Sequence, residues 1–352
     1  MSGPLAGIRI LEVGHMLAGP YCGLLLADLG AEVVKIEPPE GDIARRVSPH
    51  RIGPHNAYFA SLNRSKKSVV LDLASDEGQD ALGRLAASSQ ALVTNLRPSA
   101  IRKLGLTYDT LKQHNERIVC VALTGVMALT GDPDAPPTKA GYSAVDNSAG
   151  IMAAVGLLAK LVEGKGGQVD VAMYDVMLSQ LNYLAGASLN TGEPTRRYVD
   201  SAHPYIVPAQ LFHARDGWIV LFITHDEFWR KFCGEVGRAE WLADERFATM
   251  SARRANRDVV LAAIAQLLAT ETALHWVERL APLGVVVSNV ETLEDALASE
   301  LTRSRDMVID LPCAEGRLQA VGAAIKYSGG APRFGAPPLL GEHGAELGVA
   351  GL

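Results

Sequence analysis

The amino-acid sequence predicts an α/β protein that has a doubly wound, mostly parallel, Rossmann-like sheet and a smaller α+β domain. Over the first 200 residues, short β-branched runs alternate with longer helical stretches, which is typical of a parallel sheet covered by helices. After about residue 200, the pattern changes to a hairpin followed by amphipathic helices. The chain has 352 residues, and at ~150 residues per domain this length favours two domains.

The first element along the chain is a predicted βαβ unit. Residues 8–13 (IRILEV) and 31–36 (AEVVKI) have the apolar, β-branched composition of buried strands, and residues 21–29 between them have that of a helix. Gly30 follows this helix at a position typical of a C-cap. The alternation continues through strands expected near 69–73, 91–96, 118–125 and 169–173, and through helices expected at 76–88, about 148–161 and from 174 onward.

We predict three segments: a large domain over residues 1–200, a small α+β domain over 201–305, and a C-terminal segment, 306–352, that returns to the large domain. Asp216 and Gly217 lie between two apolar runs, which indicates a hairpin. Residues 257–268 and 273–280 have the pattern of amphipathic helices.

Composition argues against several classes of protein. The formal net charge of -6 disfavours a nucleic-acid-binding surface. The N-terminus lacks the features of a signal peptide, and no apolar run reaches the ~20 residues of a spanning helix, so we expect a cytoplasmic protein that is not in a membrane. Four cysteines without CxxC spacing are expected to be core thiols, and the absence of HExxH and GxSxG motifs disfavours a metal site and a serine hydrolase.

Three loops could contact a ligand. Residues 14–20 (GHMLAGP) join a strand to a helix N-terminus, where free backbone N–H groups favour an anion, although tight packing of the glycines explains them equally well. Residues 63–67 (NRSKK) place three cations before a strand, facing either ligand phosphates or solvent. Residues 95–98 (NLRP) end a strand at the edge where open α/β sheets bind ligands, or form a turn in which Pro98 starts a helix.

Asp146 lies in the segment AGYSAVDNSAG, before a helical run of small residues. From the residues alone, the simplest interpretation is an N-cap, because an aspartate oxygen readily accepts hydrogen bonds from free N–H groups at a helix start.

The residues of several motifs, and the order of these motifs along the chain, resemble those of the class III CoA-transferase family, which includes carnitine-CoA-transferases, formyl-CoA-transferases and α-methylacyl-CoA racemases. The matching segments run through nearly the whole chain: PLAGIRILE from Pro4, LGAEVVKIEPP from Leu29, NRSKKSVVLDL from Asn63, RPSAIRKLGL from Arg97, TGDPDAPPTKAGYSAVDNSAG from Thr130, GQVDVAM from Gly167, HPYIVPAQLF from His203 and IKYSGGAPRFGAPPLLGEH from Ile325.

This resemblance implies an acyl-CoA:carboxylate CoA-transferase in which Asp146 is the nucleophile. It implies CoA and acyl-CoA as substrates, with no tightly bound cofactor, and an interlocked homodimer. The CoA contacts that it carries over are Leu17, Ala18, Leu71, Asp72, Leu73, Ala74, Asn95, Leu96, Arg97 and Lys103.

The sequence also departs from the family pattern. Pro38 stands where an arginine often contacts the nucleotide, so phosphate binding is expected to rely on Arg64, Lys66, Arg97 or Lys103. A segment that the family has near the active site is missing between Gly125 and Val126, which disfavours the racemase alternative and leaves open an impaired CoA-binding relative. The formyl-CoA branch's glycine-rich lid has no counterpart, and the AHPYIVPAQLF segment favours dicarboxylate substrates.

Overall fold

The structure is a computed structural model, and the chain forms two compact units. Unit 1 comprises residues 1–126, 142–190 and 297–352, and unit 2 comprises residues 127–141 and 191–296. The residues that the structure describes are 3–122, 138, 140–192, 194, 196–313, 317–327 and 334–349.

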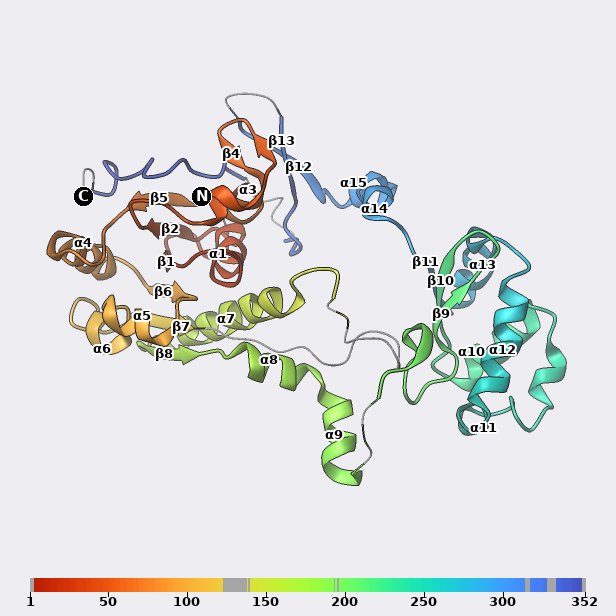
Figure 1. The fold of residues 1–352 in the computed structure, drawn as a ribbon. Helices are drawn as coiled ribbons and strands as arrows, with labels where there is room; N and C mark the ends of the chain where they lie inside the picture. The colour runs from red at the N-terminus through yellow and green to blue at the C-terminus, as the bar shows by residue number, and fades with distance from the viewer. Residues whose placement is uncertain are drawn as a thin grey trace. The chain divides into compact units, whose positions relative to one another are not determined.

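Unit 1 is built on a six-stranded sheet in the order β5-β2-β1-β6-β7-β8, in which all paired strands are parallel (Figure 1). The strand order reverses direction between β1 and β6, as in a doubly wound fold. The predicted fold class is therefore confirmed. The strands are β1 (Arg9–Val13), β2 (Glu32–Glu37), β5 (Lys67–Val70), β6 (Ala91–Thr94), β7 (Val119–Ala122) and β8 (Gly167–Asp170).

Helices cover both faces of this sheet, because its strands are apolar on both sides. On one face, α1 (Ala18–Asp28) and α7 (Ala144–Glu163) pack against each other and against the strands (Figure 1). On the other face lie α4 (Asp76–Ala87), α5 (Pro98–Lys103) and α6 (Tyr108–Leu111). Ser75 caps α4. Pro98 occupies the first turn of α5, in agreement with the interpretation of residues 95–98 as a turn in which Pro98 starts a helix.

The start of α7 differs from the prediction. The helix begins at Ala144 rather than near residue 148, and its N-cap is Ser143, so Asp146 lies in the first turn and is not the cap. The small residues of α7 allow a close approach to α1: a Cβ at Gly150 would lie 3.0 Å from the Ala18 carbonyl oxygen and 3.3 Å from the Cys22 nitrogen. By length and composition α7 could cross a membrane, a property shared with core helices of globular proteins.

Shorter elements complete unit 1. The hairpin β12 (Val308–Leu311) and β13 (Leu318–Val321) packs on α3 (Ala57–Asn63). The segment that follows pairs with the sheet region, since the His343 N–H donates to the Ser68 carbonyl at 3.0 Å. The remaining elements of unit 1 are α2 (Ala44–Val47), β3 (Arg51–Ile52), β4 (His55–Asn56), α8 (Met173–Gln180), α9 (Asn182–Thr191) and α15 (Glu300–Ser304), while α14 (Leu293–Ala298) includes the boundary at residues 296 and 297 where unit 2 ends.

Unit 2 is an α+β unit with its own apolar core. Its antiparallel sheet has the order β11-β10-β9, and Asp216 and Gly217 lie in the β9–β10 hairpin loop, as predicted. The two predicted amphipathic helices are present with the expected bounds, as α12 and α13. Its elements are η1 (Val199–Ser201), β9 (Ala209–His213), β10 (Trp218–Phe222), α10 (Asp226–Glu235), η2 (Ala239–Leu242), α11 (Met250–Ala255), α12 (Arg257–Leu268), α13 (Ala273–Leu280), η3 (Ala281–Leu283) and β11 (Val286–Asn289).

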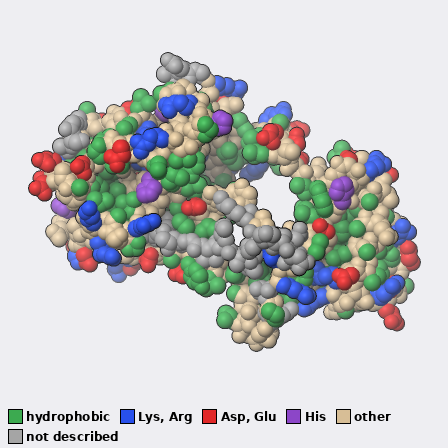
Figure 2. All heavy atoms as spheres, in the orientation of Figure 1, with side chains coloured by type: hydrophobic (Ala, Val, Ile, Leu, Met, Phe, Trp, Pro, Cys, Tyr) green, Lys and Arg blue, Asp and Glu red, His purple; other side chains and the backbone are tan. Residues whose placement is uncertain are grey.

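The surface charges and cysteines agree with the composition. On the face shown in Figure 2, basic and acidic side chains are interspersed, and no extended basic area is visible there. Cys22, Cys120 and Cys233 are buried, as expected of core thiols, whereas Cys313 is partly exposed.

Candidate active site

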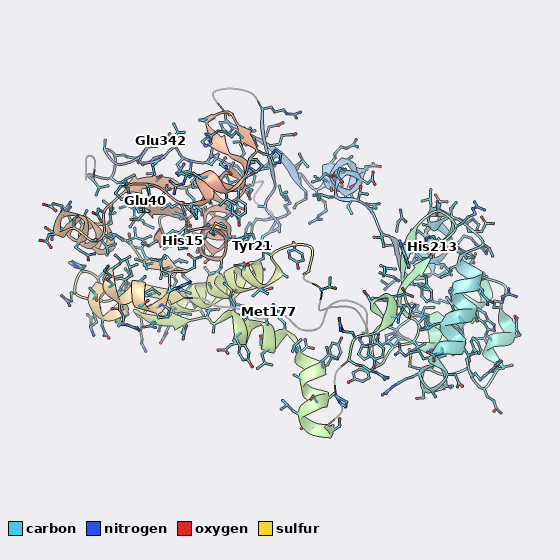
Figure 3. All side chains as sticks on the ribbon, viewed as in Figure 1. His15, Tyr21, Glu40, Met177, His213 and Glu342 are labelled. Carbon is cyan, nitrogen blue, oxygen red and sulfur yellow. The ribbon has the colours of Figure 1, made fainter. Side chains whose placement is uncertain are left out.

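A cavity of about 450 Å³ lies beyond the carboxyl ends of strands β1, β2, β5 and β6 in unit 1. It lies at the edge of the sheet, beside the point where the strand order reverses, where doubly wound folds bind ligands. Figure 3 labels His15 and Glu40, which come from the loops after β1 and β2. The lining residues are Val13, Gly14, His15, Ile36, Glu37, Pro38, Glu40, Gly41, Asp42, Ile43, Arg46, Leu71, Asp72, Leu73, Ala74, Leu96 and Leu104.

About half of the CoA contacts that the family resemblance implied line this cavity. Residues 71–74, which follow β5, and Leu96, which follows β6, are among the lining residues. Leu17 and Ala18 lie at the start of α1, with Ala18 buried against α7, and neither lines the cavity. Arg97 and Lys103 are exposed at the two ends of α5 and also lie outside the lining.

Asn95 joins the two halves of the sheet at the reversal point. Its amide nitrogen donates to the His15 carbonyl at 2.8 Å, and its amide oxygen accepts from the His15 N–H at 3.1 Å. A Cβ at Gly14 would lie 2.5 Å from the same amide oxygen and would displace it, and a Cβ at Gly19 would lie 3.1 Å from it and would crowd it. The side chain of Asn95 therefore holds the loop that borders the cavity.

Beneath that loop is a fully buried ion cluster. The Lys35 ammonium lies 2.8 Å from Glu12 Oε1 and 2.8 Å from Asp42 Oδ2, and it donates to the Gly14 carbonyl at 3.0 Å. Burial opposes the ionisation of Glu12, but the ammonium groups of Lys35 and Lys66 hold its pKa below the ordinary value. Asp42 Oδ1 accepts from the Met16 N–H at 3.2 Å, and this hydrogen bond holds the backbone of the loop after β1.

A second carboxylate, that of Glu37 at the end of β2, is held in the same way. Its two oxygens accept from the Arg45 guanidinium at 2.6 and 2.7 Å, and it also accepts from the Ser68 hydroxyl at 2.6 Å and the Asp42 N–H at 2.9 Å. Burial favours the neutral acid, but the hydrogen bonds from Arg45 and the charge of Lys35 lower the pKa of Glu37.

The three cations of residues 63–67 are paired with carboxylates from other segments, an arrangement that neither of the two interpretations of this run, ligand phosphates or solvent, had anticipated. Arg64 is buried and pairs with Asp28 at 2.6 Å, and Lys66 is buried and pairs with Glu12 at 2.6 Å. Lys67 is paired with Glu32 at 2.6 Å. The sequence shows the three cations but not the carboxylates of α1, β1 and β2 that the fold places opposite them.

Asp146 is half-buried in the first turn of α7, four residues before Gly150, and so on the side of the helix that packs on α1. It does not line the cavity. The loop after β1 lies between them: its first residues, Gly14 and His15, line the cavity, and Ala18, the first residue of α1 after the loop, contacts α7.

Two further features of the site were not predicted. Burial, together with the negative charges of Asp146 and Asp42, raises the pKa of Tyr58. The segment after β2 supplies Glu40, Ile43 and Arg46 to the cavity. The Gly41-Asp42 turn signal was present in the sequence, but nothing in it showed that the turn borders a ligand site.

Among the described residues, no group of three or more His, Cys, Asp or Glu side chains could hold a metal ion.

A model of CoA-transferase family III matches residues 5–126 and 119–344. The chain belongs to CoA-transferase family III. It is 33% identical to the succinyl-CoA:mesaconate CoA-transferase of Haloarcula hispanica, with 98% of this chain and 96% of the relative covered. It is 31% identical to the acetyl-CoA:oxalate CoA-transferase of Acetobacter aceti, with 98% and 95% covered. A CaiB/BaiF family protein from Brucella suis has the same fold, with a TM-score of 0.82, 30% identity and 99% of each chain covered.

Membership in this family makes the chain a CoA-transferase, an enzyme of acyl-CoA metabolism. The two matches to the family model overlap at residues 119–126, close to the position where the sequence suggested a missing segment. The alignment with the Haloarcula enzyme runs over 384 positions, more than the 352 residues of this chain, so the relative has residues that this chain lacks. Gly125 and Val126 themselves lie outside the described residues.

We predict that Glu37→Gln destabilises the protein at pH 7 by ~3 kcal/mol, because it leaves the Arg45 guanidinium without its buried carboxylate. The pKa of Glu37 is lower in the folded state than its ordinary value of 4.5. The contribution is therefore complete above pH 4.5 and is lost as the pH falls through the folded value. Urea unfolding of both proteins at pH 7 and pH 4 should show a difference that shrinks at pH 4. Glu163→Gln removes an exposed carboxylate that also has a lowered pKa and is the control; an equal loss in both variants would contradict the prediction.

Proposed function

We propose that this enzyme moves CoA between carboxylic acids through a covalent intermediate on Asp146. The observation that carries the proposal is the position of this carboxylate, half-buried beside the loop that connects it to the cavity at the sheet edge. Residues 71–74 and Leu96 bind the nucleotide part of CoA in that cavity. The pantetheine arm follows the loop that contains Leu17 and Ala18 toward α7.

The chemistry balances with a single carboxylate. Asp146 attacks the thioester carbonyl of the donor acyl-CoA, which releases the CoA thiolate and forms a mixed anhydride. The thiolate then attacks the aspartyl carbonyl of the anhydride, which releases the donor carboxylate and leaves an aspartyl-CoA thioester. The acceptor carboxylate repeats the two steps in the opposite direction, which forms the new acyl-CoA and restores Asp146.

The start of α1 supplies groups that favour this chemistry. The first backbone N–H groups of a helix have no partner within the helix, and those of Ala18 and Gly19 lie in the first turn of α1, which packs beside α7. Donors of this kind stabilise the oxyanion that develops when a thioester or anhydride is attacked. Asn95 and the buried Lys35 cluster hold the loop before them, so these donors are fixed before the substrate binds.

We further propose that the substrates are dicarboxylates and their CoA thioesters. The support comes from relatives: the Haloarcula and Acetobacter enzymes are named for mesaconate and oxalate, and a 31% identical Agrobacterium fabrum enzyme is named succinate–glutarate CoA-transferase. CoA acts as a substrate and not as a resident cofactor. We place the enzyme in the cytoplasm, where acyl-CoA substrates are formed, and recovery of the protein in a membrane fraction would contradict this placement.

A homodimer is also proposed, as the family resemblance implies. Several large apolar side chains on α7 and α8 remain exposed in the single chain, including Val155 at 54% and Tyr174 at 56%. Apolar surface of this kind is characteristic of a surface covered by another chain.

The test of the mechanism is the chemical trapping of Asp146. During turnover of succinyl-CoA, hydroxylamine or borohydride should modify this residue alone, as detected by mass spectrometry. Asp146→Ala and Asp146→Asn should lower the exchange rate by at least about a thousandfold while the affinity for CoA is retained. Asp175→Asn removes an exposed carboxylate from the first turn of α8 and should leave the rate unchanged. Full activity of either Asp146 variant would remove this residue from the mechanism.

The substrate proposal predicts a preference that can be measured directly. With succinyl-CoA as donor, kcat/KM for mesaconate, glutarate or oxalate should exceed that for monocarboxylates of equal length by at least about tenfold, since a second carboxylate adds a charge-assisted contact. Equal values for the two classes would exclude the dicarboxylate assignment while leaving the transferase chemistry intact.

The dimer proposal predicts a particle of twice the 37.4 kDa chain mass in solution, measured by light scattering after size-exclusion chromatography. Val155→Lys, at an exposed position of α7, should shift the particle toward the monomer because it introduces a charge into an apolar interface. A wild-type protein that stays monomeric at all concentrations would contradict the proposal.

A further inference from the structure

The phosphates of CoA need a cationic partner. Several lysines and arginines that could bind them by residue type are already paired with carboxylates in the folded chain. Arg64, Lys66 and Lys67 are each paired with a carboxylate, and Arg45 is held by both oxygens of Glu37. A cation already neutralised by a buried carboxylate contributes little field to a ligand outside the cluster.

The cavity itself has an unusual balance of charge. Two of its lining carboxylates, Glu37 and Asp42, are buried and neutralised by Arg45 and Lys35. Two others, Glu40 and Asp72, are exposed. Among the described residues that line the cavity, Arg46 is the sole Lys or Arg.

The position of Arg46 is fixed by the same cluster that holds the loop. It lies in the short helix α2, whose first N–H, that of Ala44, donates to Asp42 Oδ1 at 2.8 Å. One guanidinium nitrogen of Arg46 donates to the Glu40 carbonyl at 2.9 Å, which uses one of the several N–H donors of this group. The side chain is exposed, and no ion pair between described residues includes it.

Arg45 and Arg46 therefore have different roles although they are adjacent. Arg45 turns inward to Glu37 and stacks on Phe59, with 3.7 Å between the guanidinium carbon and the ring centroid. Arg46 lines the cavity, where a planar guanidinium with several donors can bind two oxygens of one phosphate.

We propose that Arg46 binds a phosphate of the nucleotide part of CoA and is the residue that makes a cavity with exposed carboxylates accept this anion. This assignment rests on the proposed function, since it takes CoA as the substrate of the cavity. Arg97 and Lys103 are exposed at the same sheet edge but do not line the cavity. The ligand group is either the 3′-phosphate or the diphosphate, which have the same chemistry and are distinguished by truncated ligands.

The test is calorimetric binding to the full chain of CoA, of dephospho-CoA, which lacks the 3′-phosphate, and of pantetheine, which lacks all phosphates. Arg46→Gln should weaken CoA binding by about tenfold, the effect of losing one charge-assisted contact at a partly exposed site. Arg46→Lys should retain part of the affinity. Arg84→Gln, which removes an exposed cation from the last turn of α4, is the matched control and should bind as the wild type does.

The pattern across ligands decides the assignment. A loss for CoA but not for dephospho-CoA identifies the 3′-phosphate, and a loss for both but not for pantetheine identifies the diphosphate. An equal loss for all three ligands, or no loss for CoA, overturns the role of Arg46. If Arg97→Gln weakens CoA binding and Arg46→Gln does not, the cation is Arg97 and the assignment is wrong. A wild-type protein that binds no CoA would instead refute the proposed function, so the two failures are distinguishable.

Discussion

The site depends on one buried interaction, the pairing of the Glu12 carboxylate with the ammonium groups of Lys35 and Lys66. All three side chains are fully removed from solvent, and Glu12 accepts from the two lysines at 2.8 and 2.6 Å. An uncompensated charge at this depth would cost several kcal/mol, so none of the three can be lost alone without destabilising the fold. Since Glu12 lies on β1, Lys35 on β2 and Lys66 before β5, the cluster ties together the strands whose ends form the cavity.

The consequence of this pairing is a site whose backbone is set before any ligand binds. Lys35 also contacts Asp42 and the Gly14 carbonyl, and Asp42 in turn holds the Met16 N–H and the first turn of α2. On the other side of the reversal point, Asn95 holds the backbone of His15. The loop after β1 is thus fixed from both sides. Because this loop is ordered before the substrate binds, binding a long, flexible thioester costs less conformational entropy.

Much of the fold could be predicted from the sequence, because it depends on periodicity. The alternation of β-branched and helical segments was sufficient for the parallel sheet, and α12 and α13 have their expected bounds. The start of α7 was misplaced because Asp146 is as good a cap as Ser143 by residue type, and only the backbone distinguishes them. The carboxylate partners of the cations before β5 were not anticipated, for a related reason. A basic run has the same appearance whether its partners are ligand phosphates or carboxylates on distant segments.

These errors fall close to the site, and the reason is physical. In the two helices α12 and α13 and in the parallel strands, hydrophobic pattern agrees with the final structure, whereas around the cavity several charged residues are buried against the general trend. Burial is possible there because each charge has a partner from another strand or loop, a property that spacing along the chain does not encode. The same compensation separates two roles among adjacent cations. The cations that face the interior stabilise the framework. A cation at the same edge that forms no ion pair with the described carboxylates keeps the electrostatic field that an anionic substrate requires.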